Sequence, residues 1–131
     1  MRMASIFTRI INGEIPAYKL AEDDSFIAFL DVNPLRAGHA LVVPKAEVDH
    51  LFDLENGQLQ AILPFAKEVA RKIKTVVPCT RIGISVIGLE VPHAHVHLVP
   101  IDTIADLDFT KPRAKFTPAE FAALAERIRQ A

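Results

Sequence analysis

Six consecutive residues, from His93 to Leu98, alternate strictly between histidine and an apolar side chain. Successive side chains of a β-strand point to opposite faces of its sheet, so this period of two predicts a strand, here from His93 to Ile101. The apolar face of that strand is expected to pack on a core. The opposite face then carries a row of three imidazoles, those of His93, His95 and His97.

Four other short segments are rich in β-branched or aromatic residues, are bounded by turn residues and are also predicted to be strands. They are residues 17–21, 25–32, 38–43 and 80–87. The first two flank the acidic sequence Glu22-Asp23-Asp24, which is typical of a hairpin turn. Because the strands mostly follow one another without intervening helices, the five are expected to form a largely antiparallel sheet.

Three helices are predicted around this sheet. Ser5 is suited to cap a short helix that ends near Gly13. Apolar residues then recur every three or four positions over 59–77, which predicts a long helix, and Pro64 is expected to kink that helix or to delay its start. The sequence Thr117-Pro118-Ala119-Glu120 supplies an N-cap, a first-turn proline and a capping-box glutamate for a C-terminal helix. The expected fold class is therefore α+β.

The composition narrows the class of protein. With 131 residues, of which 50% are apolar, the chain is expected to fold as one domain over residues 1–131. Its formal net charge of −1 lacks the basic excess that binds a nucleic-acid backbone, so nucleic acid is not an expected partner. The single cysteine, Cys79, forms no internal disulfide, and neither a signal peptide nor a membrane span is evident. A cytoplasmic protein without a membrane partner is expected.

Three imidazoles side by side repel one another when charged, so the row is expected to serve a chemical purpose. One such purpose is metal binding, because two histidines two positions apart on a strand can share a zinc ion. His93 and His97, however, lie about 13 Å apart along an extended strand, so binding all three to one ion is strained and needs outside ligands. No cysteine pair or HExxH helix makes such a site specific, and the available donors are His39, Glu90, Asp31 and Cys79. No metal and no cofactor is expected, and a metal-dependent hydrolase remains an alternative.

The other purpose is nucleophilic catalysis. A neutral imidazole nitrogen can attack phosphorus when an acceptor holds the other ring nitrogen and neighbouring groups manage the phosphate charge and the leaving group. The middle histidine, His95, is placed for the attack, and His93 and His97 can donate to phosphate oxygens or protonate a leaving atom. A fourth histidine, His39, follows Gly38 at the start of another predicted strand.

The histidine segment, His93-Ala94-His95-Val96-His97-Leu98-Val99, has the form His-x-His-x-His-x-x with apolar residues at x. Together with three stretches that precede it in the chain, it resembles the histidine triad (HIT) family of nucleotide-binding proteins. Those stretches are residues 6–16, 28–34 and 38–45. The resemblance covers about residues 5–101, which are expected to form the core of a HIT-like domain, and residues 102–131 are expected to be a C-terminal extension that carries the last helix.

The resemblance implies a function. Family members are homodimers whose antiparallel sheets join, they bind purine nucleotides, and many hydrolyse or transfer nucleoside monophosphates. By position, His95 would attack the α-phosphorus and form a nucleotidyl-histidine intermediate that water resolves. His93 and His97 would contact phosphate oxygens or the leaving group, and His39 would support the triad. The implied reaction releases an AMP-like nucleotide from a phosphoramidate or a related substrate.

The resemblance also implies how the nucleoside is held. Asp31 would accept hydrogen bonds from the ribose hydroxyls. The base pocket would be lined by Ile6, Phe7, Ile10, Phe29 and Leu41. Ordinary core packing is an equal explanation for Ile10 and Leu41, and Asp31 beside Asn33-Pro34 can equally be a turn residue.

The chain departs from the family pattern just before the triad. Where the family usually has Gly-Gln-Ser or Gly-Gln-Thr, this chain has Gly88-Leu89-Glu90, and Ile87 lies near the place of an expected asparagine. An ionised Glu90 in the nucleotide-binding loop would repel phosphate. It therefore either selects amine-like over anionic leaving groups or marks a catalytically weak or silent nucleotide-binding protein, which is the alternative function.

A further departure concerns the N-terminal segment. Ser5 and Thr8 stand where some bacterial members have cysteines, so a structural zinc ion of that kind is not expected. Cys79 is expected to be a buried or partly buried thiol rather than a nucleophile.

Overall fold

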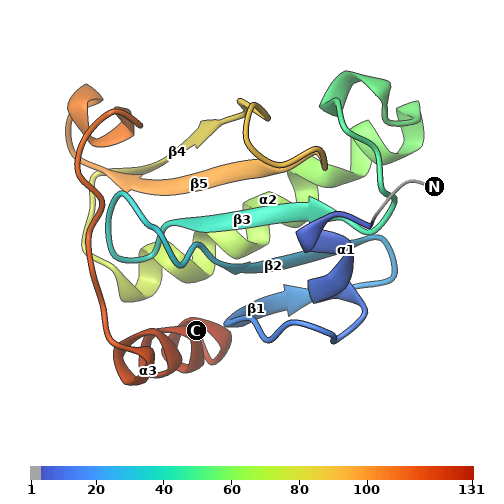
Figure 1. The fold of residues 1–131 in the computed structure, drawn as a ribbon. Helices are drawn as coiled ribbons and strands as arrows, with labels where there is room; N and C mark the ends of the chain where they lie inside the picture. The colour runs from blue at the N-terminus through green and yellow to red at the C-terminus, as the bar shows by residue number, and fades with distance from the viewer. Residues whose placement is uncertain (1–3) are drawn as a thin grey trace.

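The computed structural model describes residues 4–131, which form a five-stranded antiparallel sheet with helices on both faces (Figure 1). The strand order is β1-β2-β3-β5-β4, so β1 and β4 are the edges. The strands are β1 (Lys19–Glu22), β2 (Phe26–Leu30), β3 (Ala40–Pro44), β4 (Arg81–Ser85) and β5 (Val96–Ile101). The predicted α+β class and the predicted antiparallel sheet are both confirmed.

The histidine segment differs from its prediction in one respect. Strand β5 begins only at Val96, so the strand predicted to start at His93 is wrong over its first three residues. The backbone there makes other bonds: the His93 N–H donates to the carbonyl of Val91 (2.8 Å), and the Ala94 N–H donates to the carbonyl of Val48 (2.7 Å). The first two histidines therefore lie in a bend that leads into the strand, and only His97 lies in the strand itself.

Pro64 neither ends nor delays the long helix. Helix α2 runs over 21 residues, Asn56–Val76, and includes this proline, so the predicted late start is wrong. Pro64 and Gln60, whose carbonyl loses its helical donor, both lie on the exposed side, where water can replace the missing hydrogen bond. The buried stripe of α2 is formed by Ile62, Ala66, Val69 and Ile73.

The two remaining α-helices begin at the predicted caps. In α1 (Ile6–Ile11) the Ser5 side chain accepts a hydrogen bond from the Thr8 N–H, and in α3 (Pro118–Arg129) Thr117 and Glu120 form a complete capping box. Two short 3₁₀ helices are η1 (Leu51–Asp53) and η2 (Ile104–Leu107). Among residues 4–131, no helix has the length and apolar character needed to cross a membrane.

The helices divide the core into two layers. Helices α2 and α3 cover one face of the sheet, where Val96 and Leu98 of β5 belong to the main hydrophobic cluster. Helix α1 lies over the other face and packs on a smaller cluster, made by Phe7, Ile27, Phe29, Leu41 and Val43. The histidine segment faces this second layer, where the Phe7 ring of α1 packs edge-on against His95.

Candidate active site

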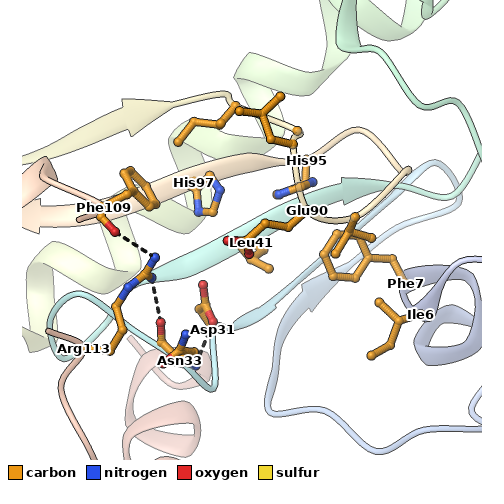
Figure 2. Close-up of a pocket in the computed structure, with 14 residues that line it drawn as sticks. Ile6, Phe7, Asp31, Asn33, Leu41, Glu90, His95, His97, Phe109 and Arg113 are labelled. Atoms are coloured by element: carbon orange, nitrogen blue, oxygen red, sulfur yellow. Dashed lines mark hydrogen bonds between the residues drawn. The ribbon is translucent and has the colours of Figure 1, made fainter. Parts of the chain in front are cut away.

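A cavity of about 310 Å³ opens on the α1 side of the sheet, and the side chains that line it come from five parts of the chain (Figure 2). Its two lining histidines are His95 and His97, whose ring centroids lie 4.9 Å apart. The other predicted site residues that line it are Ile6, Phe7, Asp31, Leu41 and Glu90. Phe29, Ile10, His39 and His93 lie outside this lining, and the first two pack in the cluster behind Phe7.

His95 has one ring nitrogen held and the other free for attack. Its Nδ1 lies 2.8 Å from the carbonyl oxygen of His93, and because a carbonyl can only accept, Nδ1 carries the proton. When the ring is neutral, the lone pair is therefore on Nε2. The Phe7 ring packs edge-on at 5.0 Å between centroids, and His97 packs at 4.9 Å. His95 therefore has the tautomer and the fixed orientation that a nucleophilic imidazole requires.

A chain of hydrogen bonds fixes the tautomers of His39 and His97. The backbone N–H of Leu35 donates to His39 Nδ1 (2.9 Å), so a neutral His39 carries its proton on Nε2. This Nε2–H donates to His97 Nδ1 at 2.9 Å, with Asp31 Oδ2 also 3.5 Å away. His97 consequently has its own proton on Nε2, where it is a donor for a bound ligand.

Burial keeps these imidazoles neutral. Loss of water contact lowers the pKa of His39 to about 4, although the Asp31 carboxylate opposes this change and Arg113 adds to it. The pKa of His97 is lowered to about 3, first by burial and then by electrostatic repulsion from His39 and His95 in their protonated forms and from Arg113. Burial also lowers the pKa of His93. All three are therefore uncharged at neutral pH.

His93 contacts the protein on both ring nitrogens. Its Nε2–H donates to the Pro44 carbonyl (2.7 Å), and its Nδ1 accepts from the Ser5 hydroxyl (2.7 Å). The side chain is completely buried and lies outside the cavity lining. Its predicted direct contact with phosphate does not fit this position, because neither nitrogen is left for a ligand. In this structure His93 positions His95 through its carbonyl and holds helix α1 through Ser5.

Ser5 and Thr8 form part of the same attachment. The Glu47 Oε1 atom accepts hydrogen bonds from the Ser5 backbone N–H (2.6 Å) and from the Thr8 hydroxyl (2.7 Å). Ser5 and Thr8 therefore attach α1 to Glu47 by hydrogen bonds, and Ser5 also attaches it to His93. This attachment sets the position of Phe7, which lines the cavity.

Asp31 has one carboxylate oxygen in a turn and the other at the cavity. Oδ1 accepts from the backbone N–H of Asn33 (2.8 Å), and Oδ2 lies beside His39. The two interpretations from the sequence, a turn residue and a ligand-binding residue, are therefore compatible. The loop residues Ile87, Gly88, Leu89 and Glu90 also reach the cavity, and Figure 2 shows the Glu90 side chain above Leu41 and near His95.

Seven lining residues were not predicted as site residues. Four belong to the loop before the triad, namely Ile87, Gly88, Leu89 and Val91, and the others are Asn33, Phe109 and Arg113. The Phe109 ring packs edge-on against His97, with centroids 4.8 Å apart, and also contacts His39. Residues 102–116 show no regular pattern, so nothing local in the sequence indicates which of their side chains turn inward. The aromatic and basic residues in this segment were the only available signal.

The structure also gathers three possible metal ligands. One donor atom each from Asp31, His39 and His97 lies within 4.8 Å of the other two. The two imidazole nitrogens involved already share a proton at 2.9 Å, so a cation would have to displace that proton. In the structure, Asp31, His39 and His97 instead form a hydrogen-bonded relay that leads to the cavity.

The fold and the site together define an α+β protein with a cluster of buried imidazoles at a cavity of about 310 Å³. The sequence matches the model of the HIT domain family over residues 12–104, and the chain belongs to the histidine triad family.

Relatives and solved structures agree with the family. An adenosine 5′-monophosphoramidase of Schizosaccharomyces pombe is 34% identical over 132 residues, covering 96% of each chain. The corresponding protein of Saccharomyces cerevisiae is 39% identical over 99 residues, 74% of this chain and 62% of that protein. The crystal structure of a Hit-like protein from Bartonella henselae is 28% identical, covers 96% of this chain and 95% of its own, and has a TM-score of 0.80. The family thus includes nucleotide hydrolases.

Proposed function

We propose that this protein hydrolyses nucleoside phosphoramidates and releases an AMP-like nucleotide through a nucleotidyl-histidine intermediate on His95. The observation that carries the proposal is the His95 tautomer, with Nδ1–H donated to the His93 carbonyl and a lone pair left on Nε2. Similarity to two adenosine 5′-monophosphoramidases supports the choice of substrate class.

The chemistry balances with groups at the cavity. His95 Nε2 forms a bond to the α-phosphorus while the bond from phosphorus to the leaving nitrogen breaks. The leaving amine takes the electron pair and one proton, which the His97 Nε2–H is positioned to donate. Water then attacks the phosphorus of the intermediate while the bond from phosphorus to His95 Nε2 breaks, which releases the nucleotide and restores neutral His95. The proton that the water loses passes to His97 and replaces the one given to the amine. Asp31 would bind the ribose hydroxyls, and Ile6, Phe7 and Leu41 would contact the base.

Glu90 supports an amine as the leaving group. Its carboxylate lines the cavity on the loop next to His95, where the resemblance to the family leads us to expect a neutral hydroxyl. A carboxylate accepts hydrogen bonds from a protonated amine and repels a departing phosphate. We therefore expect faster AMP release from an adenosine phosphoramidate than from a dinucleoside polyphosphate, and faster cleavage of the polyphosphate would contradict this role.

The central experiment compares the wild type with His95→Ala on adenosine phosphoramidate and follows AMP by chromatography, with and without a chelator. We expect turnover in the wild type, loss of at least about 10³-fold in the variant, and no effect of the chelator. Sensitivity to the chelator would favour the metal-dependent alternative. Retained AMP binding without turnover would favour the silent nucleotide-binding protein.

A second copy of this chain is the proposed partner. Strand β4 is an edge, and beside it lies an apolar groove between α2 and the sheet. The residues that line this groove include Leu63 and Ile84, which are 56% and 51% exposed. Two copies related by a twofold axis would pair their β4 edges and cover both grooves, in keeping with the joined sheets that the family resemblance implies.

Sedimentation should give a dimer for the wild type, and Ile84→Glu should give a monomer. A monomeric wild type would contradict the dimer proposal.

The cytoplasm is the proposed location. The single cysteine, Cys79, suits a reducing compartment.

A further inference from the structure

The segment of residues 102–116, which lines one side of the cavity, is held by hydrogen bonds at both ends. At its start, Arg36 donates to Asp102 (3.2 Å) and to Asp106 (3.0 Å). At its end, the Ala114 N–H donates to the Pro34 carbonyl at 2.9 Å. The residues between these anchors therefore have a fixed path past the cavity, and they include both Phe109 and Arg113.

The Arg113 guanidinium is held at the rim of the cavity. Nη1 donates to the carbonyl of Asn33 (2.9 Å), Nη2 donates to the carbonyl of Phe109 (3.4 Å), and the guanidinium carbon lies 5.3 Å from the centre of the Phe109 ring (Figure 2). These bonds use two of the five N–H donors of an arginine. None of the ion pairs among residues 4–131 includes Arg113, so its charge is not neutralised by a carboxylate there.

Arg113 differs in charge from the other residues that line the cavity. Asp31 and Glu90 contribute negative charge, and burial keeps His39 and His97 neutral at pH 7 by lowering the pKa of each. The backbone and side chains of Gly88 and Leu89 add no charge. Among the lining residues of the described chain, Arg113 alone has a permanent positive charge.

We propose that Arg113 binds a phosphate group of the nucleotide ligand and so determines the preference of this site for nucleotides over nucleosides. The guanidinium has free N–H donors in a planar fork that matches two phosphate oxygens. The inference rests on the proposed function for the class of ligand, but not on turnover. The phosphate can be the 5′-phosphate or one on the 3′-hydroxyl, because the guanidinium bonds to the carbonyl of Asn33, two residues from Asp31, which is proposed to bind the ribose.

Calorimetric titration tests this proposal with three probes: AMP, adenosine and adenosine 3′-monophosphate. The variants are Arg113→Ala, Arg113→Lys and, as a matched control, Arg127→Ala on the exposed side of α3. Loss of a charge-assisted hydrogen bond should weaken the binding of one phosphate-bearing probe by about 10-fold to 100-fold in Arg113→Ala. Adenosine binding should change by less than about 2-fold, and Arg113→Lys should recover part of the loss because a point charge replaces the fork.

The outcomes separate the possibilities. A loss confined to AMP assigns Arg113 to the 5′-phosphate, and a loss confined to the 3′-isomer assigns it to a phosphate on the ribose. The proposal is overturned if Arg113→Ala weakens adenosine and both phosphate-bearing probes by the same factor, or weakens none of the three. Because these titrations need no catalysis, a wild type that fails to cleave phosphoramidates would contradict the proposed hydrolase and leave this result intact.

Discussion

Lowering the pH from 7.5 to 5.0 should destabilise this protein strongly, because its site contains buried neutral histidines. Burial lowers the pKa of His39 to about 4 and the pKa of His97 to about 3. In the unfolded chain, a histidine has a pKa of about 6.5. At low pH the unfolded state therefore binds protons that the folded state does not bind, so the free energy of unfolding decreases as the pH is lowered.

The magnitude follows from the two pKa values. The stabilising contribution is fully present above pH 6.5, the unfolded pKa, and is lost as the pH falls toward the folded values. At pH 5.0 an unfolded histidine lies 1.5 pH units below its pKa, which is worth about 2 kcal/mol for each group at about 1.4 kcal/mol per unit. Since both folded pKa values lie below 5, His39 and His97 together should account for about 4 kcal/mol.

Urea unfolding followed by circular dichroism at pH 7.5 and at pH 5.0 measures this difference. In His39→Asn the new amide can still accept from Leu35 and donate to His97, and about half of the pH dependence should disappear. The control, His50→Gln, removes an exposed histidine and should leave the pH dependence unchanged. A wild type that loses less than about 1 kcal/mol between the two pH values would refute the reasoning, as would equal effects of the two variants.

Three further substitutions test other contacts by thermal or urea denaturation. Ser5→Ala removes a helix cap and the hydroxyl that donates to His93, so about 2–4 kcal/mol should be lost, whereas Ser5→Thr should retain most of the stability. Gly38→Ala should cost about 2–4 kcal/mol, because φ is +88° there and an added Cβ would lie 3.0–3.2 Å from three side chains. Thr117→Ala breaks a capping box and should cost about 1 kcal/mol. Losses below about 0.3 kcal/mol would contradict each assignment.

Local sequence patterns were sufficient where a structure is stabilised by its own neighbours in the chain. The caps at Ser5 and Thr117 were predicted correctly, since a cap bonds to a backbone group three residues away. The period of apolar residues likewise located α2, and the alternation of the histidine segment located β5. Each of these signals lies within a single helix or strand.

Local patterns failed where a distant part of the chain determines the conformation. The bend at His93 depends on Val48, whose carbonyl accepts from Ala94, and this partner lies 46 residues away. The inward direction of Phe109 and Arg113 depends on the anchors of their segment at Arg36 and Pro34. No periodicity near these residues encodes such contacts. The role of His93 was missed for the same reason, because its partners Ser5 and Pro44 are remote in the sequence.

The pH dependence and the role of Arg113 are consequences of one property, the burial of the triad. Neutral His39 and His97 keep the tautomers that expose a donor at His97, but they give up the positive charge that a phosphate would otherwise meet. If the stability proves independent of pH between 7.5 and 5.0, the histidines are able to hold protons in the folded state, and Arg113 would then be one cation among several. A steep pH dependence together with an unchanged affinity of Arg113→Ala for AMP and for its 3′-isomer would require a phosphate bound by neutral donors alone. The two measurements therefore constrain each other, and the structure predicts that both effects will be large.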